Sequence, residues 1–154
     1  MSSVTFFGHW IINQNIYNDV KSVVIDLIEN QKATTFYVGT HGGFDDMAQK
    51  VLAELSLVYP SIKYYIVFAY YDTKHKYFES DEECIKHTIF PEGLEKVPRR
   101  FAIIERNRWM IKQSDIVVTY VKHIESGAAI AKEIAEKAKK KVINIPEITN
   151  FSTN

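Results

Sequence analysis

Residues 34–57 read TTFYVGTHGGFDDMAQKVLAELSL, and they contain a strand, a glycine-rich turn and a helix in direct succession. The first five residues are β-branched or aromatic and stop at Gly39, which predicts a buried strand. After the turn, Met47, Val51 and Leu55 recur at the three-to-four spacing of one helix face. A strand that passes directly into an amphipathic helix is the unit from which parallel sheets are built.

The same alternation of apolar runs and amphipathic segments continues along the chain. Apolar runs predict four more strands, at residues 4–7, 63–71, 115–121 and 142–145. Helical spacing predicts three more helices, at residues 15–29, 98–113 and 126–140. Alternating strands and helices favour an α/β fold, a three-layer sandwich with a mainly parallel sheet of about five strands. We expect a single domain over residues 1–148 and a flexible tail at residues 149–154.

The composition is that of a globular domain, and it narrows the range of functions. Of 154 residues, 46% are hydrophobic, and 19 basic and 19 acidic side chains give a formal net charge of zero. A chain without a basic surplus is not expected to bind nucleic acid non-specifically. A small phosphorylated ligand is compatible with zero net charge, because a local cluster of positive side chains is enough to bind it.

The chain has one cysteine, Cys84, so no internal disulfide can form and a cytoplasmic location is expected. The first residues lack the basic and apolar regions of a signal peptide. The longest apolar run, residues 64–71, is too short to cross a bilayer, so no membrane association is expected. Two His/Glu pairs with helical spacing lie in the polar segment 72–93. A solvated loop explains them, and we expect no metal site and no cofactor.

Distinctive residues stand where three of the predicted strands end. In open α/β sheets, ligands bind outside the carboxyl ends of the strands, where the strand order reverses. Glycines let a ligand approach the backbone, and the helix starts that follow favour anions. Tight turns and close helix–sheet packing explain the same small residues without a ligand. The candidate ligand-binding residues at these strand ends are Gly8, His9, Gly39, His41, Gly42, Gly43, Phe44, Asp45, Ser126, Gly127 and Ala128.

All four arginines of the chain fall within residues 99–108. Arginine suits two-pronged contact with phosphate or carboxylate, whereas lysine is a flexible point charge. Arg99 and Arg106 share one face of the predicted helix, and Arg100 and Asn107 share the adjacent face. We therefore expect these four residues to bind an anionic ligand. The alternative is that the arginines form structural ion pairs with acidic neighbours in the same segment.

Three motifs resemble the SLOG superfamily, and within it the YpsA-like branch. They are VTFFGHW at residues 4–10, FYVGTHGGFDDMA at residues 36–48, and PRRFAIIERNRWMIKQSDIVVTYV at residues 98–121, with SGAAIAKEIAEKAKKKVINI following after a short turn. The resemblance implies a Rossmann-like fold that binds a nucleotide or nucleotide-derived small molecule, in some members as a sensor in stress or defence signalling. It also implies a homo-oligomer, a dimer or larger. We expect phosphate on the helix starts at residues 42–43 and 126–127.

The same superfamily includes the LOG-type phosphoribohydrolases, which release a free base from a nucleoside 5'-monophosphate. Arg106, Met110 and Asp115 match the spacing of the first half of their signature. The second half of the signature is not matched by this sequence. No glycine pair precedes the helix, and Glu133 lies two positions later than the family's carboxylate. If the chain is such an N-glycosidase, Arg106 and Glu133 are its catalytic candidates. Ligand binding is the leading expectation, with hydrolysis and a partner-binding module as alternatives.

Overall fold

The computed structural model describes residues 2–70 and 87–152 of the chain. In this part of the chain, six parallel strands form one sheet in the order β4-β3-β2-β1-β5-β6. The strands are β1 (Ser2–Gly8), β2 (Ala33–Val38), β3 (Lys63–Val67), β4 (Thr88–Ile89), β5 (Ile116–Tyr120) and β6 (Lys141–Asn144). The helices are α1 (Tyr17–Asn30), α2 (Gly43–Val58), α4 (Arg99–Gln113), α5 (Gly127–Lys137) and α6 (Ile145–Ser152), with 3-10 turns at Gln14–Ile16 and Leu94–Lys96.

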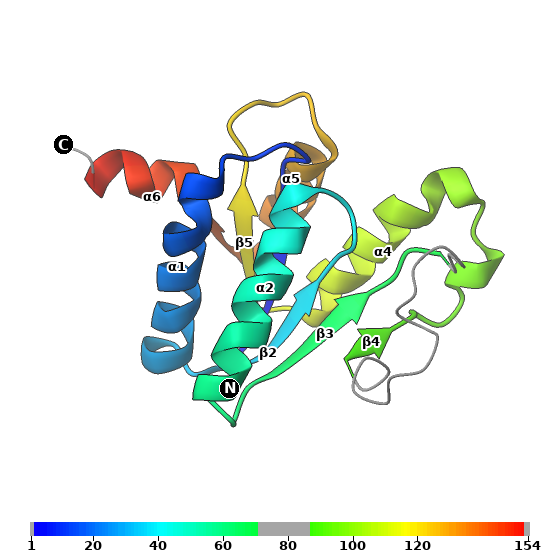
Figure 1. Ribbon diagram of the computed structural model, residues 1–154. Helices are drawn as coiled ribbons and strands as arrows, with labels where there is room; N and C mark the ends of the chain where they lie inside the picture. Colours follow the sequence, from blue (N-terminus) through cyan, green and yellow to red (C-terminus); the bar gives the residue numbers. More distant parts are fainter. Residues whose placement is uncertain (1, 71–86, 153–154) are drawn as a thin grey trace.

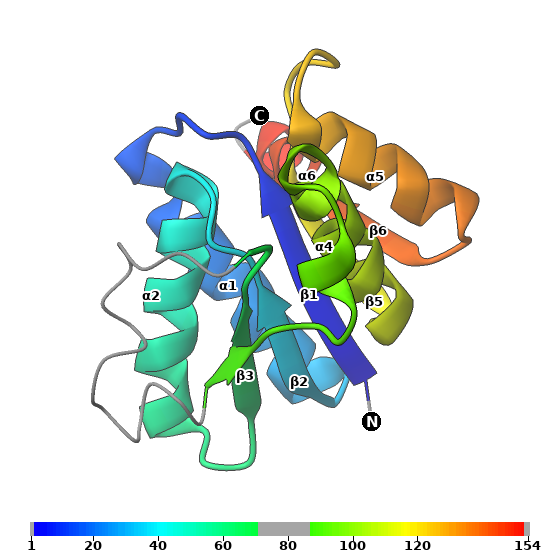
Figure 2. The same ribbon diagram turned by 90° about the vertical axis from the view of Figure 1, so that its right-hand side faces the viewer.

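The sheet lies between two layers of helices, so the predicted three-layer α/β sandwich is confirmed. Helices α1, α2 and α6 cover one face, and α4 and α5 cover the other (Figures 1 and 2). Successive side chains of a strand point to opposite faces. Accordingly, Phe6 joins the core that includes Leu52 of α2, whereas Phe7 packs with Met110 of α4 and Ala135 of α5. Burial on both faces explains why the strands are continuous apolar runs in the sequence.

The sheet has six strands rather than about five. The additional strand, β4, contains only Thr88 and Ile89 and pairs with β3 at the sheet edge. Two residues carry no periodicity, so the sequence pattern could not reveal this strand. Strand β3 ends at Val67, before the end of its apolar run at residue 71. Strand β6 ends at Asn144, because Ile145 already belongs to α6.

Helix α6 extends through residue 152 and so occupies much of the segment for which we expected a flexible tail. Pro146 stands in its first turn, where a missing backbone N–H leaves no helical hydrogen bond unmade. Residues 71–86, which include Cys84 and most of the polar segment, lie outside the described residues, as do residues 153–154. Within the two described ranges, none of the helices combines the length and apolar character that crossing a membrane requires.

The strand order reverses between β1 and β5. From β1 the chain builds the sheet outward through β2, β3 and β4, and then it returns to place β5 on the other side of β1. In doubly wound sheets, the crevice outside the carboxyl ends of the strands at this reversal is the usual ligand site. The loops that follow β1 and β5 meet at that point, together with the starts of α2 and α5 (Figure 2).

Candidate functional site

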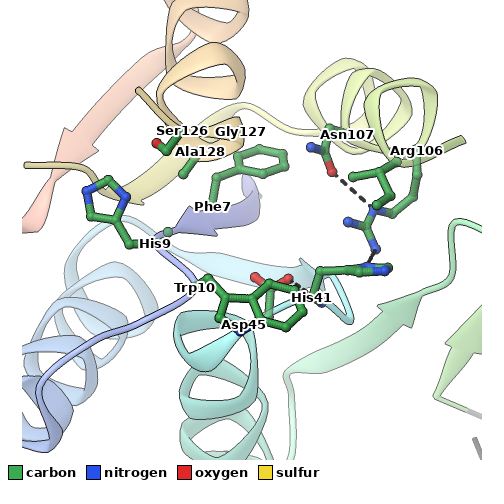
Figure 3. Close-up of a pocket in the computed structure, with 12 residues that line it drawn as sticks. Phe7, His9, Trp10, His41, Asp45, Arg106, Asn107, Ser126, Gly127 and Ala128 are labelled. Atoms are coloured by element: carbon green, nitrogen blue, oxygen red, sulfur yellow. Dashed lines mark hydrogen bonds between the residues drawn. The ribbon is translucent and has the colours of Figure 1, made fainter. Parts of the chain in front are cut away.

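A cavity of about 380 Å³ opens at the reversal of strand order. Its walls come from the end of β1, the start of α2, the middle of α4 and the start of α5 (Figure 3). The structure brings together nine of the residues proposed from the sequence: Gly8, His9, His41, Asp45, Arg106, Asn107, Ser126, Gly127 and Ala128. Residues that are far apart in the chain therefore share one concave surface, as the strand-end argument predicted.

Three lining residues were missed by sequence reasoning: Phe7, Trp10 and Ile103. Phe7 packs in the core, and its position near the end of β1 also brings it to the cavity. Trp10 is 67% exposed. Its place in the sequence, two residues after the glycine that ends a strand, could have marked it as a candidate cavity residue. Ile103 precedes Arg106 by three residues, a spacing that places both on one helix face. Together the three residues supply the apolar wall.

Arg106 is the central charged residue of the cavity and is only 2% exposed. Its Nε donates to Oδ1 of Asn107 at 3.1 Å, and its Nη1 donates to Oγ1 of Thr40 and to the carbonyl oxygen of Val67, each at 3.2 Å. Two of the three guanidinium nitrogens are thereby fixed in place. The third, Nη2, donates to no described residue.

Asp45 is the buried carboxyl group of the same cavity. Burial raises its pKa from the usual 3.8 to about 6, although the nearby Arg106 and the hydrogen bond from the His41 N–H both lower it. Burial also lowers the pKa of Arg106, and the Asp45 charge opposes that effect. Gly39 lies next to both the Asp45 carboxyl group and the Arg106 guanidinium. A Cβ atom at Gly39 would lie 2.8 Å from Oδ2 of Asp45 and 3.1 Å from Cζ of Arg106. A side chain at Gly39 would therefore disturb both.

Two backbone N–H groups at the start of α2, where we expected phosphate, already have acceptors. The Gly43 N–H donates to the carbonyl oxygen of Trp10 at 2.6 Å, and the Phe44 N–H donates to that of His9 at 3.4 Å. The loop after β1 thus takes two of the backbone donors that a phosphate at this turn would use. Gly42 has a φ of +97° and packs against Trp10, so its role is conformational. Phe44 is fully buried in the core.

The start of α5, by contrast, has backbone donors to offer. Ser126 caps the helix, because its Oγ accepts from the Ala129 N–H at 3.0 Å. The N–H groups of Gly127 and Ala128 have no acceptor among the residues that the structure describes. Both residues line the cavity, and open space surrounds the position of a Cβ atom at Gly127. These donors favour the expected phosphate position at residues 126–127, which stays a prediction.

The Ser126 cap leads to a stability prediction. Ser126→Ala removes the acceptor for the Ala129 N–H, and we expect the free energy of unfolding to fall by about 1 kcal/mol. Urea denaturation followed by circular dichroism would measure the change. Ser56→Ala is the matched control, because Ser56 Oγ only donates to the Ala53 carbonyl oxygen within α2. Equal losses for the two variants would contradict a capping role.

His9 follows β1 directly and is 7% exposed. Its Nε2 accepts from the Lys122 N–H at 2.8 Å, and its ring is stacked on that of His123, with 4.0 Å between centroids. Its Nδ1 is buried and has no hydrogen-bond partner, the one such side-chain atom found within the described ranges. Burial, His123 and Lys122 all lower the pKa of His9. The ring is therefore neutral at neutral pH.

Arg99 and Arg100 do not line the cavity, although both were expected to bind the ligand. Arg99 lies over the ring of Tyr70 at 4.1 Å, and Arg100 lies over the ring of Phe101 at 4.8 Å. Seven residues separate Arg99 from Arg106, which is roughly 10 Å along a helix, and the Arg99 side chain packs on Tyr70 and not in the cavity. Arg108 is exposed beside a different hollow that includes Trp109.

Glu133 also lies outside the cavity. It stands on an exposed face of α5, where its carboxylate is 3.0 Å from Nζ of Lys137. Six residues separate it from Gly127 at the helix start, roughly 9 Å along the axis. The carboxyl group that does line the cavity with Arg106 is Asp45. In residues 2–70 and 87–152, no group of three or more His, Cys, Asp or Glu side chains is placed to hold a metal ion.

The fold and the cavity define a Rossmann-like α/β protein whose candidate ligand site lies at the carboxyl ends of a parallel sheet. The family model YpsA, described as the YspA SLOG family, matches residues 11–152. The chain belongs to this family, and the resemblance found in the three sequence motifs is confirmed. No curated protein matches the sequence.

Two similar solved structures are those of DNA processing protein A from Helicobacter pylori and from Streptococcus pneumoniae. The first is 18% identical with a TM-score of 0.62, over 92% of this chain and 63% of that chain. The second is 15% identical with a TM-score of 0.64, over 92% of this chain and 49% of that chain. This chain spans less than two thirds of either protein, and at these identities the likeness shows a shared fold alone.

One expectation from the composition is contradicted by this comparison. Zero net charge led us to expect no non-specific binding of nucleic acid. The Helicobacter pylori protein, however, has this fold and binds single-stranded DNA. Contact with a strand depends on the local surface and not on the sum of all charges. Net charge therefore does not exclude nucleic acid as a partner.

Proposed function

We propose that the cavity binds a nucleotide or nucleotide-derived small molecule through its phosphate. The observation that carries this proposal is a set of cavity-lining donors that donate to no described residue. They are Nη2 of Arg106 and the backbone N–H groups of Gly127 and Ala128. Polar groups in protein interiors normally have partners. A guanidinium and a helix start both favour an anionic oxygen as that partner.

The size and walls of the cavity support the same ligand class. Its volume of about 380 Å³ lies within the roughly 300–1,000 Å³ of typical small-molecule sites. Phe7, Trp10 and Ile103 offer an apolar wall against which a base or sugar can pack. Asn107 accepts from Arg106 through Oδ1, which leaves its amide nitrogen to donate to a base or sugar oxygen. A role as a sensor in stress or defence signalling stays a prediction.

The proposal is tested by calorimetric titration with nucleoside mono- and diphosphates, cyclic nucleotides, ADP-ribose and single-stranded oligonucleotides. We expect at least one small nucleotide to bind. An oligonucleotide that binds more tightly than every mononucleotide would indicate that the ligand continues beyond the cavity. Trp10, Gly42 and Tyr70 line an adjoining open hollow over which a strand could pass. If no member of the panel binds, the proposed function is wrong.

Arg106→Lys tests the residue at the centre of the proposal. Lysine keeps the positive charge but loses the planar fork, so we expect affinity for the bound nucleotide to fall about tenfold. Arg108→Lys is the matched control, because Arg108 lies on the same helix but outside the cavity. Calorimetry with both variants gives the comparison, and circular dichroism verifies that each is folded. Equal affinity in the two variants would remove Arg106 from the binding site.

A second candidate function is hydrolysis of the N-glycosidic bond of a nucleoside 5'-monophosphate. One observation favours it: Asp45, with a pKa raised to about 6, lines the same cavity as Arg106. A carboxyl group with such a pKa can donate a proton to a leaving base or activate water near neutral pH. Chromatography for free base after incubation with each monophosphate tests this candidate. If no monophosphate releases base, hydrolysis is wrong and the binding proposal is unaffected.

A further inference from the structure

The His9 ring is held rigidly at the edge of the cavity. It is 7% exposed, and Lys122, the second residue after β5, donates its N–H to Nε2 at 2.8 Å. His123 stacks on the ring with planes 3° apart, and Tyr120 contacts it edge-on, with 6.3 Å between centroids. These contacts fix the direction in which the remaining ring nitrogen points.

The hydrogen bond at Nε2 determines where the ring proton lies. A nitrogen that accepts a hydrogen bond carries no proton, so the neutral imidazole of His9 has its proton on Nδ1. A second proton would have to lie on Nε2, against the Lys122 N–H. The neighbours Lys122 and His123 also disfavour a positive ring. His9 is therefore a neutral donor with Nδ1–H as its one polar hydrogen.

Within residues 2–70 and 87–152, that donor has no acceptor. Nδ1 is buried, and no hydrogen-bond partner for it exists among the described residues. Buried donors without a partner are rare and unfavourable, and in native proteins they call for a specific explanation such as a bound molecule. The ring lines the same cavity as Gly127 and Ala128, and in Figure 3 one of its nitrogens faces the side on which Ser126 and Ala128 lie.

Three donors thus share one wall of the cavity: the Gly127 N–H, the Ala128 N–H and Nδ1–H of His9. We infer that His9 is a phosphate-binding residue, whose neutral ring donates Nδ1–H to an oxygen of the phosphate that lies against the start of α5. The inference rests on the proposed function for its ligand class. Arg106 lies across the cavity from His9 (Figure 3), so the two residues would donate to different anionic oxygens of the same ligand.

Nuclear magnetic resonance of the full chain with ¹⁵N-labelled histidine tests this role directly. Without ligand, His9 should have the spectrum of a ring protonated on Nδ1. Inorganic phosphate at millimolar concentration should then shift the Nδ1–H proton downfield, together with the amide signals of Gly127 and Ala128. A His9 ring protonated on Nε2, or an Nδ1 signal that phosphate does not move, would overturn the inference.

Two substitutions test the roles of the two ring nitrogens of His9 one at a time. In His9→Gln, the side-chain oxygen can replace Nε2 as acceptor for the Lys122 N–H, but the donor toward the cavity is lost. In His9→Asn, the amide nitrogen can replace Nδ1 as donor, but the contact with Lys122 is lost. We expect His9→Gln to lower affinity for adenosine 5'-monophosphate about tenfold and to leave affinity for adenosine unchanged. His9→Asn should keep most of the affinity for the monophosphate.

The failure of this inference is distinguishable from failure of the proposed function. If nucleotides bind and require Arg106, but His9→Gln binds the monophosphate as wild type does, only the role of His9 is wrong. If no nucleotide binds, but inorganic phosphate moves the Nδ1 signal, the phosphate site stands and the nucleotide proposal is wrong. Equal losses for adenosine and its monophosphate would mean that His9 acts only on the structure of the loop.

Discussion

Gly8→Ala is expected to destabilise the protein by about 3 kcal/mol, because a Cβ atom at Gly8 would overlap the ring of Phe44. Phe44 is fully buried in the first turn of α2 and stacks on Tyr120, with 6.1 Å between ring centroids. The ring therefore cannot rotate away, and the clash must be relieved by separating α2 from the sheet. Urea denaturation would measure the loss as a lower transition midpoint.

Gly127→Ala provides the matched control for this prediction. No atom lies within 4 Å of a Cβ built at Gly127, and its φ is not positive. Alanine is also a better helix former than glycine, so the variant should be as stable as wild type or slightly more stable. If Gly8→Ala were as stable as Gly127→Ala, close packing of α2 on β1 would not be the reason for glycine at position 8.

The fold was predictable because each long strand and helix has a local pattern of apolar residues in the sequence. Strands covered on both faces become continuous apolar runs, and helices with one buried side show three-to-four spacing. Phe6 and Phe7 together indicated burial on both faces of β1, and Val51 and Leu55 indicated the buried side of α2. Strand β4 was not predictable, since it depends on pairing with β3 and on nothing in its own two residues.

The site was predictable only in part, because its details depend on contacts between distant segments. Strand ends and small residues correctly indicated which loops form the cavity. They could not show that the carbonyl oxygen of Trp10 accepts from the Gly43 N–H, at a helix start where we expected phosphate. Nor could they show that Asp45, rather than Glu133, supplies the carboxyl group beside Arg106. Nor could they show that Arg99 packs on the ring of Tyr70 and does not line the cavity.

Asp45 makes the protein less stable as the pH rises, and the direction follows from its pKa. The pKa is raised from 3.8 to about 6 in the folded state, mainly by burial. Between these values the folded protein binds more protons than the unfolded chain, so the free energy of unfolding decreases as pH increases. The total change is about 3 kcal/mol, and it is complete by about pH 7, one unit above the folded pKa. The attraction to Arg106 is already included, since it lowers the raised pKa.

Asp45→Asn should therefore stabilise the protein by about 3 kcal/mol near pH 7.5 and have little effect near pH 4. The asparagine oxygen can still accept from the His41 N–H, which now donates to Asp45 at 2.9 Å. Urea denaturation across this pH range measures the difference, with Asp46→Asn as the exposed neighbouring control. A less stable Asp45→Asn protein at pH 7.5 would contradict this prediction. It would mean that the Asp45 carboxylate serves mainly to balance the buried positive charge of Arg106. A more stable one would mean that the carboxylate is kept at a cost to folding, as is common for residues that act on a ligand.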